Sequence, residues 1–263
     1  MRLRAALADV SQGFANHRAW RYLASEHVKN SYRRTVLGPW WLTVQSALYV
    51  LGLAIVFGDL LNSTLQEFLP YVAVGYLAFI LLSGIVRSGM SVFVGNAGLI
   101  KSTRQPLSSL VLRSVTIELI QFGHNAVILV LLFAGRFITP SPWLAVAPLS
   151  LAVILLNGVA AGLWLGLLVA RFRDIGPAVE SVLQVIVFFV PVFYRASDLH
   201  GSRALLLAWN PFTYFIDLLR SPLLGDRPSL GTLVGVCGFS VLNLIIATVT
   251  FSRLRSRLPY WVG

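Results

Sequence analysis

The chain has 263 residues, of which 57% are hydrophobic and only 12% are charged, and its mean hydropathy is +0.77. A soluble domain of this length needs more charged surface, so the composition excludes a soluble enzyme and a nucleic-acid-binding protein. We interpret the formal charge of +11 as topological, because Lys and Arg collect in the cytoplasmic loops of membrane proteins. The single cysteine, Cys237, excludes an intrachain disulfide framework and a cysteine metal site.

Residues 1–35 are polar and basic, and their apolar residues recur at near-helical spacing. The first of these are Leu3, Leu7, Val10 and Phe14. This pattern predicts an amphipathic helix that lies on the inner membrane surface. The segment lacks the apolar core of a cleavable signal peptide, so we expect the mature protein to start at Met1.

Six apolar stretches are long enough to cross a bilayer as helices. They are Trp41–Leu61, Phe68–Val86, Val115–Phe133, Trp143–Ala170, Ile175–Tyr194 and Leu230–Phe251, of which the fifth is the weakest. Residues 195–229 include an apolar part, Ala204–Leu224, which is interrupted by Asn210-Pro211 and carries two charges, Asp217 and Arg220, that would be costly at mid-membrane. We therefore expect two short re-entrant helices there. The prediction is an all-α polytopic membrane protein with one domain, residues 1–263.

The basic residues are distributed unevenly between alternate segments of this topology. The N-terminal segment, the C-terminal segment and the even-numbered loops hold 16 of the 21 Lys and Arg residues, and the other loops hold 5. This asymmetry places both termini in the cytoplasm.

Ionisable groups inside the predicted spans are few. Glu118 and His124 lie six residues apart on the third span, a separation that puts them on opposite sides of a helix. They are interpreted as packing or pathway-lining groups, with coupled proton transfer as the alternative. No hydrolase, metalloprotease or Cys-x-x-Cys motif occurs in the chain, so we expect no catalytic residue and no metal site.

The inner loop, residues 91–110, contains a segment that only partly fits a phosphate-binding loop. In Gly95–Ser102 the second glycine of that motif is replaced by Ile100, which disfavours the required backbone conformation and excludes nucleotide binding. The loop is either a simple connector or a docking helix for a cytoplasmic subunit, with a short helix ending before Pro106. The residues alone leave both interpretations open.

Two other patterns have a packing explanation. Gly158, Gly162 and Gly166 follow a small-xxx-small spacing, which allows a second helix backbone to approach closely. Four aromatic residues between 188 and 194 form either a belt at the outer interface or a channel lining on which sugar rings stack. From the residues alone we favour the belt.

Several segments, in order across nearly the whole chain, carry a family resemblance. They are residues 32–41 (YRRTVLGPWW), 96–101 (NAGLIK), 170–175 (ARFRDI), 191–194 (PVFY), 210–212 (NPF) and 259–262 (PYWV). With these segments the sequence resembles the transmembrane subunit of ABC-2-type polysaccharide exporters, the permease family for O-antigen, capsule and teichoic acid.

The resemblance implies a homodimeric permease in the bacterial inner membrane, paired with two copies of a separate ATPase subunit that binds ATP and magnesium. Its substrate would be an undecaprenyl-pyrophosphate-linked glycan moved out of the cytoplasm. ATP-driven closure of the partner subunits would push on the inner loops and open a path between the two permease copies. This chain itself would carry no cofactor.

The resemblance also implies roles for particular residues. Arg33 and Arg34 would attract the lipid pyrophosphate. Asn96, Lys101, Arg104 and Pro106 would belong to the coupling segment that meets the ATPase. Phe188, Phe189, Phe193 and Tyr194 would line the channel, which reverses the preference for a belt. Asn210, Pro211 and Phe212 would belong to the outer gate.

Three alternatives stay open at this point. An ABC-2 permease for a drug or a small lipid has the same architecture. An ion-coupled secondary transporter would use intramembrane carboxylates, of which only Glu118 is present. A membrane-embedded glycosyl or phospholipid transferase would need acidic residues in a loop, whereas Asp174 is explained as a helix cap. The glycan could be O-antigen, capsule, teichoic acid or cell-wall galactan.

Overall fold

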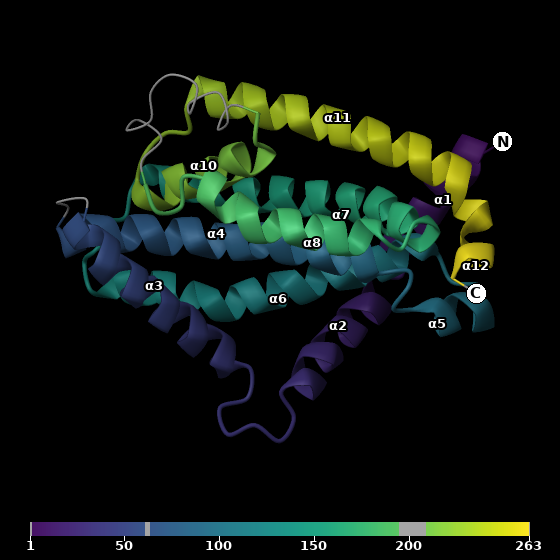
Figure 1. The fold of residues 1–263 in the computed structure, drawn as a ribbon, viewed down its shortest axis with the longest axis horizontal. Coiled ribbons are helices and arrows are strands. Elements are labelled where there is room, and N and C mark those ends of the chain that lie inside the picture. Colours follow the sequence, from purple (N-terminus) through teal and green to yellow (C-terminus); the bar gives the residue numbers. More distant parts are fainter. Residues whose placement is uncertain (1, 61–63, 195–208, 263) are drawn as a thin grey trace.

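A computed structural model describes residues 2–60, 64–194 and 209–262, and all regular structure in these ranges is helical (Figure 1). The long helices are α3 (Trp40–Leu60), α4 (Leu65–Ser91), α6 (Leu107–Ala134), α7 (Ala147–Arg171) and α11 (Leu230–Leu254). The shorter helices are α1 (Arg2–Ala15), α2 (His17–Ser31), α5 (Ala97–Ser102), α8 (Ile175–Ile186), α10 (Pro211–Leu224) and α12 (Leu258–Trp261). The described residues also contain three short 3-10 helices: η1 (Pro142–Val146), η2 (Val187–Phe189) and η4 (Arg255–Arg257).

Within the described ranges, five helical segments are long and apolar enough to cross a membrane. They are Trp40–Gly58, Leu65–Ser91, Leu107–Ala134, Pro142–Arg171 and Leu230–Trp261. These correspond to five of the six predicted spans and show a multi-pass membrane protein. The remaining candidate, the fifth predicted span (Ile175–Tyr194), is shorter in the structure than predicted.

That shorter element consists of α8 and η2, which together cover Ile175–Phe189. At 1.5 Å per residue it spans about 22 Å, less than the roughly 30 Å of a bilayer core. Its helix ends because Val190 is extended, with φ −125° and ψ 138°, as expected for a residue that precedes a proline. The six-span count is therefore not confirmed.

The centre of the bundle is α4, which contacts α3, α6, α7 and α10 (Figure 1). In the most apolar window of α4, 72% of the residues are buried, against 17% for α11. Large apolar side chains of α4 belong to the main core, among them Phe68, Val72, Leu77 and Ile85. Helices α3, α6 and α7 thus pack directly on α4, whereas α11 packs on α7 and α10.

The glycine spacing on α7 has the predicted packing role. A Cβ atom on Gly89 of α4 would lie 2.9 Å from the Cα of Gly162, and one on Gly166 would lie 2.9 Å from the carbonyl oxygen of Gly89. A Cβ atom on Gly158 would lie 2.7 Å from Cγ2 of Ile85. The backbones of α4 and α7 are therefore in direct contact.

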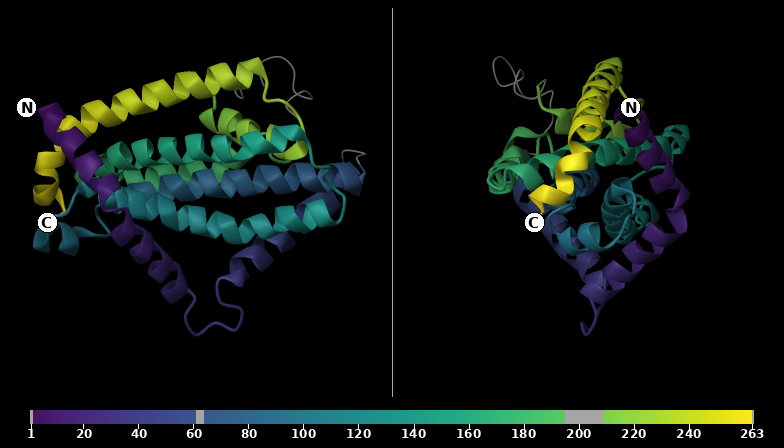
Figure 2. Two further views of the ribbon diagram at one scale, coloured as in Figure 1. Left: turned by 180° about the vertical axis from the view of Figure 1, so that it is seen from behind. Right: turned by 90° about the vertical axis from the view of Figure 1, so that its right-hand side faces the viewer.

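The N-terminal segment differs from a single surface helix. It forms two helices, α1 and α2, joined at Asn16. Ala6 of α1 is buried in a cluster with Phe251 and Leu258 near the C-terminus, and α2 packs along α6. Figure 2 shows α1 crossing the end of the bundle beside the end of α11 and the C-terminal helices. Both termini and α5 lie at this same end, which we call the inner end.

We predict that Gly89→Ala destabilises the protein, because the new methyl group must push the α4 and α7 backbones apart. Overpacking of this kind costs about 1–3 kcal/mol, which lowers the Tm of the purified protein in detergent. Gly52→Ala is the matched control, since no atom lies within 4 Å of a Cβ there, and its Tm should be unchanged or slightly higher. Equal Tm values for the two variants would contradict this packing role.

Candidate functional site

The predicted coupling segment is a short helix at the inner end. Helix α5 covers Ala97–Ser102 and ends there because Thr103 is extended. Three residues, 103–105, separate the end of the helix from Pro106. Asn96 donates a hydrogen bond from Nδ2 to the carbonyl oxygen of Val92, at 2.7 Å, which ties the segment to the end of α4. Ile100 is buried, whereas Lys101 and Arg104 are exposed. The segment is thus fixed on one side and presents two cations on the other.

A carboxylate from α1 holds the start of the helix that follows. Asp9 is only 7% exposed and accepts hydrogen bonds from the backbone N–H of Leu107, at 3.2 Å, and of Ser108, at 3.0 Å. The Ser108 hydroxyl also donates to Asp9 Oδ1, at 2.8 Å. Asp9 therefore caps the N-terminus of α6 from another helix, where a negative charge is stabilising.

This role of Asp9 could not be predicted from the sequence, because a cap supplied from about 100 residues away leaves no local pattern. Arg255 lies near the same carboxylate, with Nη1 3.7 Å from Asp9 Oδ2, and also donates to the carbonyl oxygen of Ala5. The close approach of α1 requires Gly13, whose added Cβ would lie 2.2 Å from Ser108 Oγ. The two chain ends and the coupling segment thus meet at one buried acid.

Arg33 and Arg34 lie on the linker between α2 and α3, which projects away from the bundle (Figure 1). Both are exposed. Arg34 has φ 73°, a left-handed conformation that non-glycine residues adopt rarely. In the described part of the chain, the structure does not place either arginine beside a cavity.

A polar cavity of about 370 Å³ lies at the inner end between α2, α4 and α6. Its polar lining includes His27, Ser88, Ser91, Arg113, Glu118 and Gln121. The Nε atom of Arg113 is buried and has no hydrogen-bond partner among the described residues. Partial burial, and secondarily the charge of Arg113, lower the pKa of His27 below its ordinary value, which favours the neutral imidazole.

Glu118 and His124 contact different helices, as their spacing predicts. Glu118 packs against α4, where an added Cβ on Gly84 would lie 2.2 Å from Oε2, and it hydrogen-bonds with Ser88. The His124 ring lies edge-on to Trp40 of α3, with ring centroids 5.9 Å apart. The two side chains therefore do not form an acid–base pair.

The four aromatic residues predicted to line a channel have different surroundings. Phe188 and Phe189 are exposed, by 69% and 44%. Phe193 is only 7% exposed and stacks on Phe57, with centroids 5.8 Å apart. Tyr194 is partly buried and donates to the carbonyl oxygen of Phe188, at 3.4 Å. Within one protomer, only Phe188 and Phe189 are free to face something else.

The predicted gate residues begin α10. Asn210 caps this helix by accepting from Phe212 N, at 3.0 Å, and donates to the carbonyl oxygen of Phe189, at 3.2 Å; Pro211 follows it as the first helical residue. Residues 195–208, where the other short helix was predicted, lie outside the described residues.

Helix α10 lies along α4 in the opposite direction. Phe212 contacts Phe79, with ring centroids 6.0 Å apart, and the guanidinium of Arg220 lies 4.0 Å from the ring centroid of Tyr71. Asp217 accepts hydrogen bonds from Ser221, at 3.2 Å, and from Thr232. Asp217 therefore has hydrogen-bond partners, and the Tyr71 ring offsets part of the cost of burying Arg220, whose Nε and Nη2 atoms are buried without a hydrogen-bond partner among the described residues.

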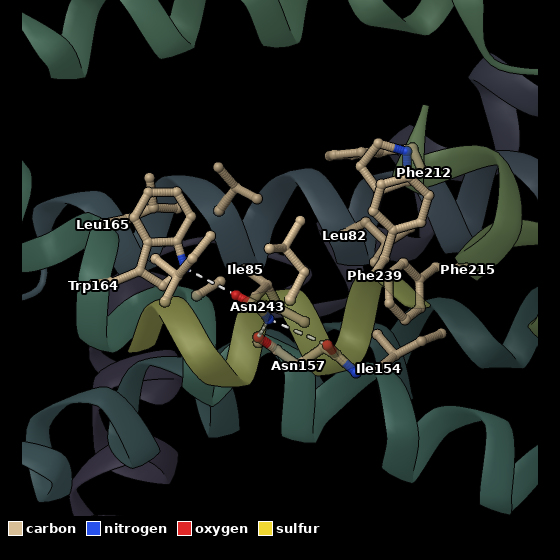
Figure 3. A pocket seen from close by; sticks show the side chains of 16 residues that line it. Leu82, Ile85, Ile154, Asn157, Trp164, Leu165, Phe212, Phe215, Phe239 and Asn243 are labelled. Atoms are coloured by element: carbon tan, nitrogen blue, oxygen red, sulfur yellow. Dashed lines mark hydrogen bonds between the residues drawn. The ribbon is translucent and has the colours of Figure 1, made fainter. Parts of the chain in front are cut away.

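An apolar pocket of about 250 Å³ lies between α4, α7, α10 and α11 (Figure 3). Phe212 and Phe215 of α10 lie on one side of it. Trp164 donates to Asn243 Oδ1, at 2.8 Å, and Asn243 Nδ2 donates to the Asn157 carbonyl oxygen, at 2.9 Å. These hydrogen bonds hold α11 against α7. The apolar lining suits hydrocarbon and offers little to a polar ligand.

Comparison with known proteins agrees with this architecture. The model of the ABC-2 type transporter family matches residues 18–224. The O-antigen export system permease protein RfbA of Myxococcus xanthus is 24% identical over 236 residues, which cover 89% of this chain and 91% of that protein. The protein of the same name from Klebsiella pneumoniae is 19% identical over 195 residues, covering 74% of this chain and 75% of that protein.

The family match covers well over half of the chain and includes α3, α4, the coupling segment, α6, α7, α8 and α10. It also confirms the resemblance drawn from the short segments. The chain belongs to the ABC-2 type transporter family, whose members are membrane subunits of transporters.

Proposed function

We propose that this chain is the permease subunit of an ATP-driven exporter that moves an undecaprenyl-pyrophosphate-linked polysaccharide out of the cytoplasm. The proposal rests on the similarity to O-antigen export permeases over 89% of the chain. Two copies would form the channel in the bacterial inner membrane, with both termini in the cytoplasm and two copies of an ATPase subunit beneath them. ATP and magnesium would bind to that partner.

The inner end supports a coupling role for α5. This helix would sit in a cleft of the ATPase, with Lys101 and Arg104 facing the partner and Ile100 facing the core. Because Asp9 caps α6 directly after this segment, a push on α5 would move α1 and α6 together. Arg33 and Arg34, on the exposed linker, would attract lipid headgroups to the inner surface by charge.

The outer half supports a path for sugars. Phe188 and Phe189 of η2 expose aromatic faces, which suit the C–H surfaces of carbohydrate rings. In a dimer these two residues would line the channel, while Phe193 and Tyr194 would support them from within one protomer. The Asn210 cap joins η2 to the start of α10, so α10 would act as a gate whose movement displaces the aromatic lining.

A second candidate function is ABC-2 transport of a small lipid, and the apolar pocket beside α10 favours it. A pocket of about 250 Å³ is near the lower limit for a small ligand, and it is too small for a polymer. The two functions differ in which molecule accumulates when the permease is lost.

We predict that depleting this chain makes a lipid-linked glycan accumulate on the cytoplasmic side of the inner membrane, because synthesis continues while export stops. The measurement is the amount of undecaprenyl-linked glycan extracted from depleted cells and from cells carrying the wild-type chain. A partner ATPase that cannot hydrolyse ATP should give the same accumulation. A small lipid accumulating in place of a glycan would favour the second function.

We predict that Lys101→Glu combined with Arg104→Glu prevents co-purification of the ATPase subunit, because two exposed cations of the coupling segment become anions. The permease itself should stay folded, since neither side chain is buried. The control is Arg253→Glu, which reverses another exposed charge near the inner end. Pairing retained in the double variant would contradict the docking role of α5.

We predict that Asp9→Ala lowers both stability and export, while the ATPase subunit still co-purifies. Loss of a helix cap costs about 1 kcal/mol, and here it also leaves the backbone N–H groups of Leu107 and Ser108 without this acceptor. Tm in detergent and ATPase-driven glycan export report the two effects. Asp174→Ala is the control, because Asp174 begins α8 without a side-chain cap bond. Equal effects of the two substitutions on Tm and on export would refute the capping role of Asp9.

A further inference from the structure

The inner cavity between α2, α4 and α6 contains a cation without a counter-ion. Arg113 extends from the second turn of α6 and forms no ion pair with any of the described residues. Its Nε atom is shielded from solvent and has no hydrogen-bond partner there. A buried donor on a charged group is costly when it is left unpaired. The arrangement is therefore incomplete without an acceptor that enters the cavity.

Glu118 is the carboxylate among the residues that line this cavity. Glu118 lies five residues further along α6, about 7.5 Å in helical rise, and hydrogen-bonds with Ser88 of α4. Arg87 of α4 also lies near Glu118, but its Nε atom is paired with Glu180, at 3.1 Å. Glu118 forms no ion pair with Arg113, so Arg113 is left without an anionic partner among the described residues of this cavity.

The lining also offers a neutral donor from a second helix. His27 projects from α2, and its lowered pKa favours the neutral ring, so one ring nitrogen can donate without adding a second cation. Ser91 and Asn96 line the cavity too, but their side chains already donate to backbone carbonyl oxygens of Arg87, Ser88 and Val92. A guanidinium with an unpaired N–H beside an imidazole donor suits the oxygens of a phosphate group.

The geometry points to a binding site for a phosphate or pyrophosphate group in this cavity, with Arg113 as the charged ligand and His27 as a second donor from the interfacial helix. It deepens the proposed function, on which it rests for the identity of the substrate, by placing the headgroup of a lipid-linked glycan against α2 and α6. The exposed Arg33 and Arg34 would then attract the headgroup, and Arg113 would hold it.

The test uses the full-length permease in phosphatidylcholine nanodiscs and inorganic pyrophosphate as the probe, with binding measured by calorimetry. We expect wild-type protein to bind and Arg113→Gln to bind about tenfold to a hundredfold more weakly, the range for a charge-assisted hydrogen-bond pair. Arg113→Lys should be intermediate, since it keeps the charge but loses the planar fork. The control Arg21→Gln removes an exposed arginine from α2 and should bind as wild type does.

Two additional measurements separate a binding role from a structural one. Pyrophosphate should raise the pKa of His27, followed by NMR of the labelled imidazole, because a nearby anion favours the protonated ring. If Arg113→Gln does not fold, as judged by its Tm, Arg113→Lys and His27→Gln carry the binding test. Absence of pyrophosphate binding by the wild type, or unchanged binding by the folded Arg113 variants, would overturn the site.

A lipid headgroup and a free anion are distinguished by adding farnesyl pyrophosphate to the nanodiscs. If farnesyl pyrophosphate displaces the bound probe at a lower concentration than unlabelled inorganic pyrophosphate does, the site binds a lipid headgroup, because the farnesyl tail confines this competitor to the bilayer surface. If the two competitors displace the probe at equal concentrations, the site binds the free anion. Glycan export in cells is scored separately. Normal export by Arg113→Gln would refute the site and leave the proposed function standing, whereas pyrophosphate binding by a wild type that exports no glycan would refute only the function.

Discussion

The contact between the backbones of α4 and α7 is the constraint on which the rest of the fold depends. In a bilayer the hydrophobic effect does not drive one apolar helix against another, so close packing and interhelical hydrogen bonds must hold the bundle together. Glycines at 89, 162 and 166 allow the two backbones to touch. This pair offers packing surfaces to α6, α10 and α11.

Polar groups within the bundle are used where packing is weakest. Helix α11 is mostly exposed, and Asn157, Asn243 and Trp164 hold it to α7 by hydrogen bonds (Figure 3). Helix α10 carries Arg220, whose guanidinium fits over Tyr71 only because Gly75 has no side chain. The asparagines and Trp164 are hydrogen-bonded to one another, whereas Arg220 has an aromatic ring beside it and the space left by Gly75. The arrangement gives the two helices defined positions without a large apolar interface.

The inner end combines rigidity with open polar space. Asp9 links α1, the start of α6 and, through Arg255, the C-terminal segment. On the opposite side of α6, the cavity beside Arg113 is bounded by α2 and by the coupling segment. A movement of α5 would therefore act on both the interfacial helices and the cavity. In an exporter, this would connect the ATPase to the place where a headgroup first meets the permease.

Local patterns determined much of this protein in advance. Apolar length located the five long helices, Gly158, Gly162 and Gly166 indicated the packing face of α7, and the short segments from Tyr32 to Val262 identified the family. These features depend on hydropathy, small-residue spacing or residue order, which a linear sequence records directly. Proline at 191 was visible too, but apolar length outweighed it, and the fifth stretch was predicted longer than its helix.

Tertiary structure decided what depends on distant partners. Asp9 caps a helix that begins about 100 residues later. Phe193 is buried in the core while Phe188 stays exposed. Arg113 lines a cavity, whereas Arg33 and Arg34, which carried the prediction, do not. No local spacing distinguishes these outcomes, because each is set by which side chains from other helices occupy the neighbouring space. The sequence by itself therefore determined the class, the family and most of the membrane spans. Only the packing of the helices decided which of the charged and aromatic side chains have partners within the chain and which remain available for contacts outside it.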